Sequence, residues 1–156
     1  MEFTVEYKDF PATKVIYLPV TVPYEEMRDF KRFFMKLGIH LFLNGAKKAT
    51  GISFIRYVGE SETTIDMEIC LEVTEFLRES KEIKCKELAS FSGKYAVAKH
   101  KGSRDRLPGI YTEMSKWFKE QGLIHSGGNM IEYYFNTSRH VPEEELLTEL
   151  LWPIEG

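Results

Sequence analysis

Apolar residues recur with a helical period in two stretches of the chain, residues 24–37 and 104–121. Their i, i+3, i+4 spacing places the apolar side chains on one face of a helix and leaves polar side chains on the other. The residues that follow this spacing are Met27, Phe30, Phe34 and Leu37, then Leu107, Tyr111, Met114 and Phe118. Gly38 and Gly122 come directly after the two stretches, where a left-handed helix terminator is favoured. The pattern therefore predicts two amphipathic helices.

Strand-like segments surround each predicted helix. Residues 52–58 and 64–73 follow the first helix, and residues 129–135 and 148–154 follow the second. The two halves repeat at an offset of about 80 residues, which is typical of a duplicated supersecondary unit. Each half reads strand, strand, helix, strand, strand, so we expect an α+β fold.

The repeat divides the chain into residues 1–74 and 83–156, joined by the charge-rich residues 75–82. Each half is too small to stand comfortably alone, so we expect one domain over residues 1–156 with the charged segment as a surface linker. Two such halves would set antiparallel sheets side by side, with both helices on one face. The opposite, concave face is then expected to hold a ligand in a central pocket at the junction.

An acid stands in the middle of the aromatic strand 129–135. Alternate side chains of a strand share a face, so Glu132 and Tyr134 point one way, while Ile131, Tyr133 and Phe135 point the other. One face is polar and aromatic, and the other is apolar. The acid either lies among aromatic rings in a pocket or faces solvent on an edge strand.

Two segments of the second half resemble a known family. The first has an acid, any residue and Tyr at 132–134, Pro-Glu-Glu at 142–144 and Thr-Glu-Leu-Leu-Trp-Pro-Ile at 148–154. The second is Gly-Lys-Tyr-Ala-Val-Ala-Lys-His-Lys-Gly at 93–102, followed by Tyr111 and by Trp-Phe at 117–118. In order and spacing these segments resemble the GyrI-like effector-binding domains, the drug-sensing modules of AraC-type and multidrug-responsive MerR-type transcription regulators.

The resemblance implies SHS2-like halves and a ligand pocket where they meet, with Glu132 and Tyr134 facing it. The further wall residues that we expect are Tyr17, Phe54, Tyr57, Tyr111 and Trp117. Aromatic rings offer apolar contact and attract positive charge, and a buried carboxylate is costly unless it is paired. We therefore expect recognition of hydrophobic, preferably cationic, drug-like compounds.

Other site chemistries find little support in the sequence. The four histidines are scattered with no Cys or carboxylate at metal-ligand spacing, so we expect no metal site. Neither a phosphate-cradling glycine pattern nor a Gly-x-Ser-x-Gly elbow is present, and Cys70 and Cys85 lie in apolar strand patterns. We expect no cofactor.

Composition narrows the class of protein. With 43% hydrophobic and 13% aromatic residues, the chain has enough apolar material for a core and an aromatic-walled cavity. A formal charge of −3 argues against direct nucleic-acid binding. Two cysteines and no leader sequence favour the cytoplasm. No apolar run is long enough to cross a bilayer, so we expect no membrane partner of that kind, while weak surface association stays open.

The regulators of this family carry a helix-turn-helix upstream, whereas this chain begins with strand-like residues 3–7. We expect a stand-alone receptor that sequesters its ligand or signals to a separate regulator. The resemblance leaves two alternatives open. One is a gyrase-inhibitor-type module that binds a protein partner, and the other is a hydrolase that opens strained cyclopropanes with Glu132, Tyr134 and Tyr111 as acid-base groups.

Overall fold

The structure, a computed structural model, describes residues 2–26, 30–136 and 140–156. Within these residues the chain forms two α-helices and eight β-strands and divides into two compact units. Unit 1 comprises Met1–Phe10 and Phe91–Gly156, and unit 2 comprises Pro11–Ser90. Each unit combines an antiparallel sheet with one helix, which confirms the predicted α+β fold.

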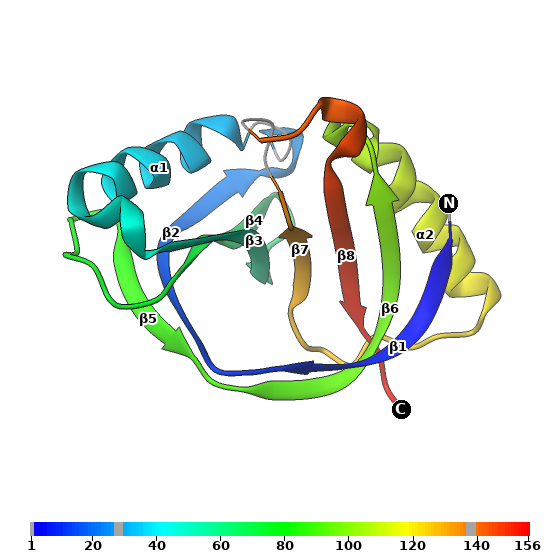
Figure 1. The fold of residues 1–156 in the computed structure, drawn as a ribbon. Coiled ribbons are helices and arrows are strands. Elements are labelled where there is room, and N and C mark those ends of the chain that lie inside the picture. The colour runs from blue at the N-terminus through cyan, green and yellow to red at the C-terminus, as the bar shows by residue number, and fades with distance from the viewer. Residues whose placement is uncertain (1, 27–29, 137–139) are drawn as a thin grey trace. The chain divides into compact units, whose positions relative to one another are not determined.

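Unit 1 contains the strand with the candidate acid. Its strands lie in the order β1-β6-β8-β7, every neighbouring pair is antiparallel, and helix α2 lies along one face of this sheet (Figure 1). The bounds of the elements are β1 Phe3–Phe10, β6 Phe91–Lys101, α2 Leu107–Glu120, β7 Met130–Tyr134 and β8 Leu147–Pro153.

Unit 2 repeats this arrangement with its strands in the order β3-β4-β2-β5, again antiparallel throughout. The bounds of the elements are β2 Thr13–Pro23, α1 Lys31–Gly45, β3 Ala49–Glu60, β4 Thr64–Val73 and β5 Lys84–Leu88.

The compact units do not coincide with the sequence repeats. The first strand of the chain, β1, pairs with β6 in unit 1, from Phe3 opposite Ala98 to Phe10 opposite Phe91. Reciprocally β5, which comes after the linker, pairs with β2 in unit 2, from Thr13 opposite Leu88 to Tyr17 opposite Lys84. Each unit thus takes one edge strand from the other half of the sequence, a pairing that periodicity cannot reveal.

The two helices differ in how well their ends were predicted. Helix α2 ends as expected, because Gly122 has φ +67° and the Leu123 N–H donates to the Phe118 carbonyl oxygen at 3.2 Å. Helix α1 does not end at Gly38. It begins at Lys31, continues through Gly38 and ends at Gly45, whose φ of +155° favours glycine. The predicted helix position Met27 lies outside the described residues.

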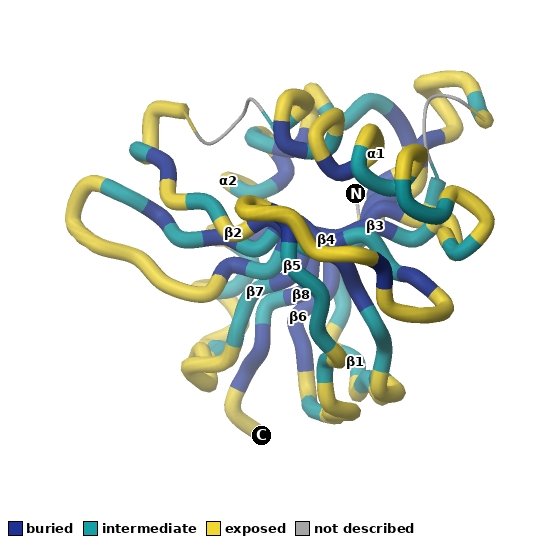
Figure 2. Tube along the Cα trace, turned by 90° about the vertical axis from the view of Figure 1, so that its left-hand side faces the viewer, coloured by how far each residue is buried: buried dark blue, intermediate teal, exposed yellow. Residues whose placement is uncertain are grey.

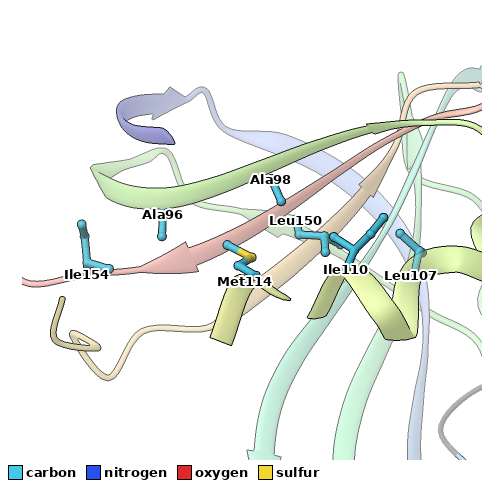
Figure 3. Packing of buried hydrophobic residues seen from close by; sticks show 7 residues of the cluster. All are labelled: Ala96, Ala98, Leu107, Ile110, Met114, Leu150 and Ile154. Carbon is cyan, nitrogen blue, oxygen red and sulfur yellow. The ribbon is translucent and has the colours of Figure 1, made fainter. Parts of the chain in front are cut away.

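The core of unit 1 lies between α2 and the sheet. Three side chains of α2 project toward the sheet, namely Leu107, Ile110 and Met114 (Figure 3). They pack with Leu150 of β8 and with Ala96 and Ala98 of β6. The alanines are fully buried, and their small side chains let the helix approach the sheet closely. Figure 2 shows the chain passing from the exposed C-terminal residues into the buried residues of β8.

The exchanged strands predict how fragments of the chain behave. Separate fragments of residues 1–74 and 83–156 each lack a strand that completes their own sheet, so each should be poorly folded alone by circular dichroism and amide hydrogen exchange. An equimolar mixture should recover protection of β6 and β2, because β1 and β5 can then pair with them. Two fragments that are independently stable, and gain nothing on mixing, would contradict this account.

Candidate functional site

Glu132 and Tyr134 lie on the face of the unit 1 sheet that α2 covers. Glu132 is opposite Leu150 of β8, which in turn is opposite Ala98 of β6, so the three side chains form one row across the sheet. Leu150 and Ala98 belong to the core under α2. The alternation within β7 is as predicted, but we expected the acid on the helix-free face. Both faces of this strand carry buried residues, so the pattern alone could not tell which face the helix covers.

Glu132 is 3% exposed and is held by two phenols. The Tyr111 hydroxyl of α2 donates to Glu132 Oε1 at 2.5 Å, and the Tyr134 hydroxyl donates to Oε2. Each carboxyl oxygen therefore has a donor, one from the helix and one from its own strand. We call Glu132, Tyr111 and Tyr134 the acidic cluster.

Arg104 brings a guanidinium next to the acidic cluster. It lies in the 3-10 turn Arg104–Arg106 just before α2, and its guanidinium carbon is 4.5 Å from the centre of the Tyr134 ring. Its Nε donates to Thr148 Oγ1 at 2.9 Å, and one Nη donates to the carbonyl oxygens of Asn136 at 3.0 Å and Leu147 at 3.2 Å. These hydrogen bonds go to neutral acceptors, and the guanidinium acts on Glu132 through its charge.

Trp152 extends the aromatic surroundings of Tyr111. The Tyr111 and Trp152 rings are stacked with their centres 6.2 Å apart, and the Phe118 ring meets the Trp152 ring edge-on with a centre-to-centre distance of 5.5 Å. The indole Nε1 of Trp152 is buried and has no hydrogen-bond partner among the described residues. An unsatisfied buried N–H costs roughly 1–3 kcal/mol. The indole N–H is therefore a donor that an acceptor on a bound molecule, or a water, could satisfy.

Burial governs the protonation of Glu132. Loss of hydration raises the pKa of its carboxyl to about 7, although the Tyr111 hydrogen bond and the Arg104 charge lower the pKa. Burial also lowers the pKa of Arg104, while the charge of Glu132 raises it. Near neutral pH the Glu132 carboxyl can thus either hold a proton or carry a negative charge. The charged form can bind a cation, and exchange between the two forms is what an acid-base group requires.

Of the other predicted residues, Trp117 lies in unit 1 and the remaining three lie in unit 2. Trp117 belongs to α2, and its ring packs against that of Phe3 of β1, with the two ring centres 5.5 Å apart. In unit 2, Tyr17 and Phe54 are both opposite Cys70 and share one face of the sheet. Tyr57 is three residues beyond Phe54 in unbroken register, so it lies on the other face. A role for these four residues in ligand binding stays a prediction.

Sequence reasoning missed two members of this environment. Arg104 begins the stretch predicted as the second helix, but it is not one of the periodic apolar residues, which start at Leu107, so the pattern gave it no role. Trp152 stands before a proline near the end of the predicted strand 148–154, and the strand pattern gives no information on a partner for its indole N–H. The sequence therefore could not predict that the indole N–H of Trp152 is buried without a hydrogen-bond partner among the described residues.

No three His, Cys, Asp or Glu side chains of the described residues gather in a group that could hold a metal ion. None of the described helices is long and apolar enough to cross a membrane.

Comparison with solved structures supports the fold. The C-terminal domain of EcmrR is 21% identical with a TM-score of 0.73, and the match covers 99% of this chain and 99% of that one. SAV2435, solved with tetraphenylphosphonium bound, is 15% identical with a TM-score of 0.65, covering 100% of this chain and 95% of that one. In the complex of EcmrR with DNA, this chain spans 57% of the matched chain, with 18% identity and a TM-score of 0.68.

A protein described as a hydrolase from Listeria innocua is 11% identical, with a TM-score of 0.54 and coverage of 97% of this chain and 91% of that one. No curated protein matches the chain significantly. The model of the GyrI-like small molecule binding domain matches residues 3–155. The chain therefore belongs to the GyrI-like small-molecule-binding family.

Proposed function

We propose that the chain is a receptor for hydrophobic cations and that Glu132 is the residue that selects their charge. One observation carries the proposal: a carboxyl group that is 3% exposed and hydrogen-bonded to two phenols. Membership of a small-molecule-binding family supports the general activity. The relative SAV2435, solved with the lipophilic cation tetraphenylphosphonium, supports the ligand class.

The acidic cluster favours a cation for electrostatic reasons. Burial deprives the Glu132 carboxylate of its hydration, and the Arg104 charge offsets only part of that loss. A further cation beside the carboxylate would restore more of the lost stabilisation. Tyr111, Tyr134 and Trp152 add ring faces, whose attraction for a cation is about 0.5–2 kcal/mol per well-placed contact. Arg104 gives the cluster positive charge on the Tyr134 side only, so a ligand cation meets least repulsion from the Tyr111 side.

Two ligands of the same shape and opposite charge test this selectivity. Tetraphenylphosphonium should bind in calorimetric titration, and tetraphenylborate should bind far more weakly because its charge repels the Glu132 carboxylate. Glu132→Gln should weaken the phosphonium by about 1–3 kcal/mol while reducing the discrimination against the borate. Glu113→Gln, which neutralises an exposed acid of α2, is the matched control and should leave both affinities unchanged.

Equal losses for both ions in Glu132→Gln would contradict the proposal, because Glu132 would then be only structural. A thermal melt of each variant separates this outcome from unfolding.

A second candidate activity is hydrolysis of strained cyclopropanes. A relative described as a hydrolase and the two phenols on Glu132 favour it. In such a reaction a water oxygen bonds to a ring carbon, the electron pair of the broken carbon–carbon bond moves into the conjugated system, and a proton is delivered to the resulting anion. Tyr111 or Tyr134 would donate that proton, and Glu132 would accept one from water. Binding alone needs no aligned water and no proton donor at the ring carbon, so we propose binding ahead of hydrolysis. A regulator or gyrase as protein partner stays a hypothesis.

Turnover separates the two activities. A duocarmycin-type cyclopropane is incubated in large excess over the protein, and chromatography measures the hydrolysed product. We expect slow or no multiple-turnover hydrolysis, since the acidic cluster can bind a ligand without any catalytic step. Sustained turnover that is lost in Glu132→Gln, reduced in Tyr111→Phe and kept in Glu113→Gln would overturn this choice and establish the hydrolase.

A further inference from the structure

Helix α1 has a second apolar face that points to solvent. Four of its large apolar side chains are mostly exposed, namely Met35 at 64%, Ile39 at 55%, Phe42 at 77% and Leu43 at 71%. Their spacing of i, i+4, i+7 and i+8 places them in one stripe. The buried residues of the helix, Phe33 and Leu37, lie on the opposite side. Figure 2 shows this alternation of buried and exposed positions along α1. We call the exposed stripe the outer face.

The outer face is more than scattered surface hydrophobicity. A surface helix needs one apolar stripe, and α1 already buries Phe33 and Leu37. A second contiguous stripe of four large side chains marks an interaction surface. It lies in unit 2, whereas the acidic cluster lies in unit 1.

The charged side chains of α1 and of the turn that follows it are all basic. Helix α1, Lys31–Gly45, contains no acidic residue, Lys31 and Arg32 form its first turn, and Lys47 and Lys48 follow its end. Two nearby lysines are paired, Lys36 with Glu82 at 3.4 Å and Lys48 with Glu75 at 3.6 Å. For Lys31, Arg32 and Lys47 the described residues show no ion pair. Among the described residues, cations without an ion pair thus stand at both ends of the stripe, and the Arg32 guanidinium lies over the Phe33 ring at 4.6 Å from its centre.

This combination selects the occupant. A second copy of the chain, packed helix to helix in either direction, would bring the cations of one α1 against those of the other. A negatively charged membrane surface has no such conflict. Its acyl boundary accepts Phe, Leu, Ile and Met side chains, and its phosphates accept Lys and Arg. The stripe also projects directly away from the core, as contact with a flat surface requires.

We propose that the outer face of α1 docks the protein on anionic lipid bilayers as an interfacial helix. The helix would lie in the plane of the surface with Met35, Ile39, Phe42 and Leu43 below the headgroups. Lys31, Arg32 and Lys47 would contact lipid phosphates. The docking is peripheral and needs no membrane-spanning helix, in keeping with the described helices.

Vesicle flotation with two matched isoleucine variants tests the proposal. Ile39 and Ile124 are similarly exposed, at 55% and 60%, but Ile124 lies outside α1. The full chain should float with vesicles of phosphatidylcholine and phosphatidylglycerol in equal parts, and not with phosphatidylcholine alone. Ile39→Gln should lower the partition coefficient by about 10-fold, and Ile124→Gln should leave it unchanged. Lys31→Gln with Arg32→Gln should lower the partition coefficient on the order of 5-fold per cation removed, and high salt should lower it as well.

The outcomes are decisive because all the altered side chains are exposed, so the fold should survive; melting curves check this. Absence of flotation by the wild type would overturn the proposal. Equal effects of Ile39→Gln and Ile124→Gln would overturn it as well, since binding would not use α1. Sedimentation velocity tests the alternative that the outer face binds a second copy of the chain. A wild-type dimer that Ile39→Gln converts to a monomer, without vesicle binding, would assign the outer face to a second copy of the chain.

Discussion

Keeping a carboxyl group out of water is the constraint on which the site in unit 1 depends. Glu132 loses its hydration between the sheet and α2, and this loss raises its pKa to about 7. Two phenols and a neighbouring guanidinium offset part of the cost. The remainder is energy that a bound cation can recover, so the same burial that destabilises the charged acid supplies affinity for a positively charged ligand.

The protonation of Glu132 links this site to the stability of the fold. Between the ordinary pKa of 4.5 and the raised value of about 7, the folded protein keeps a proton that the unfolded chain has released. The stability that this group contributes is therefore complete at acid pH and is lost as the pH rises toward the raised pKa. A cation beside Glu132 favours the charged form and removes that penalty. Ligand and proton thus compete for one carboxyl group.

The scaffold places the acidic cluster through packing that involves no polar group. Ala96 and Ala98 keep the surface of β6 low, so α2 can settle on the sheet with Met114 and Ile110 against Leu150. That approach brings the Tyr111 hydroxyl within 2.5 Å of Glu132. The turn before α2 places Arg104 over the Tyr134 ring. Larger side chains at the two alanines would move helix and phenol together.

Local patterns predicted much of this arrangement, and long-range pairing supplied the rest. Alternation along β7 correctly put Glu132 and Tyr134 on one face, and the hydrogen bond between them confirms it. Alternation could not say which face α2 covers, because Ile131 on the other face is buried too. The expected pocket wall grouped Tyr57 with Phe54, whereas a separation of three residues along a regular strand places their side chains on opposite faces. The exchange of β1 and β5 depends on pairing between distant segments, which leaves no periodic signal.

The most direct test of the central claim is the number of protons released when a cation binds. Calorimetric titration of tetraphenylphosphonium into the protein, repeated in buffers of different ionisation enthalpy, gives this number. At about pH 6, where the raised pKa keeps Glu132 largely protonated, binding should release close to one proton, and the number should fall toward zero by about pH 9. Glu132→Gln should release none. Binding without proton release at the lower pH, or the same release in Glu132→Gln, would contradict the account.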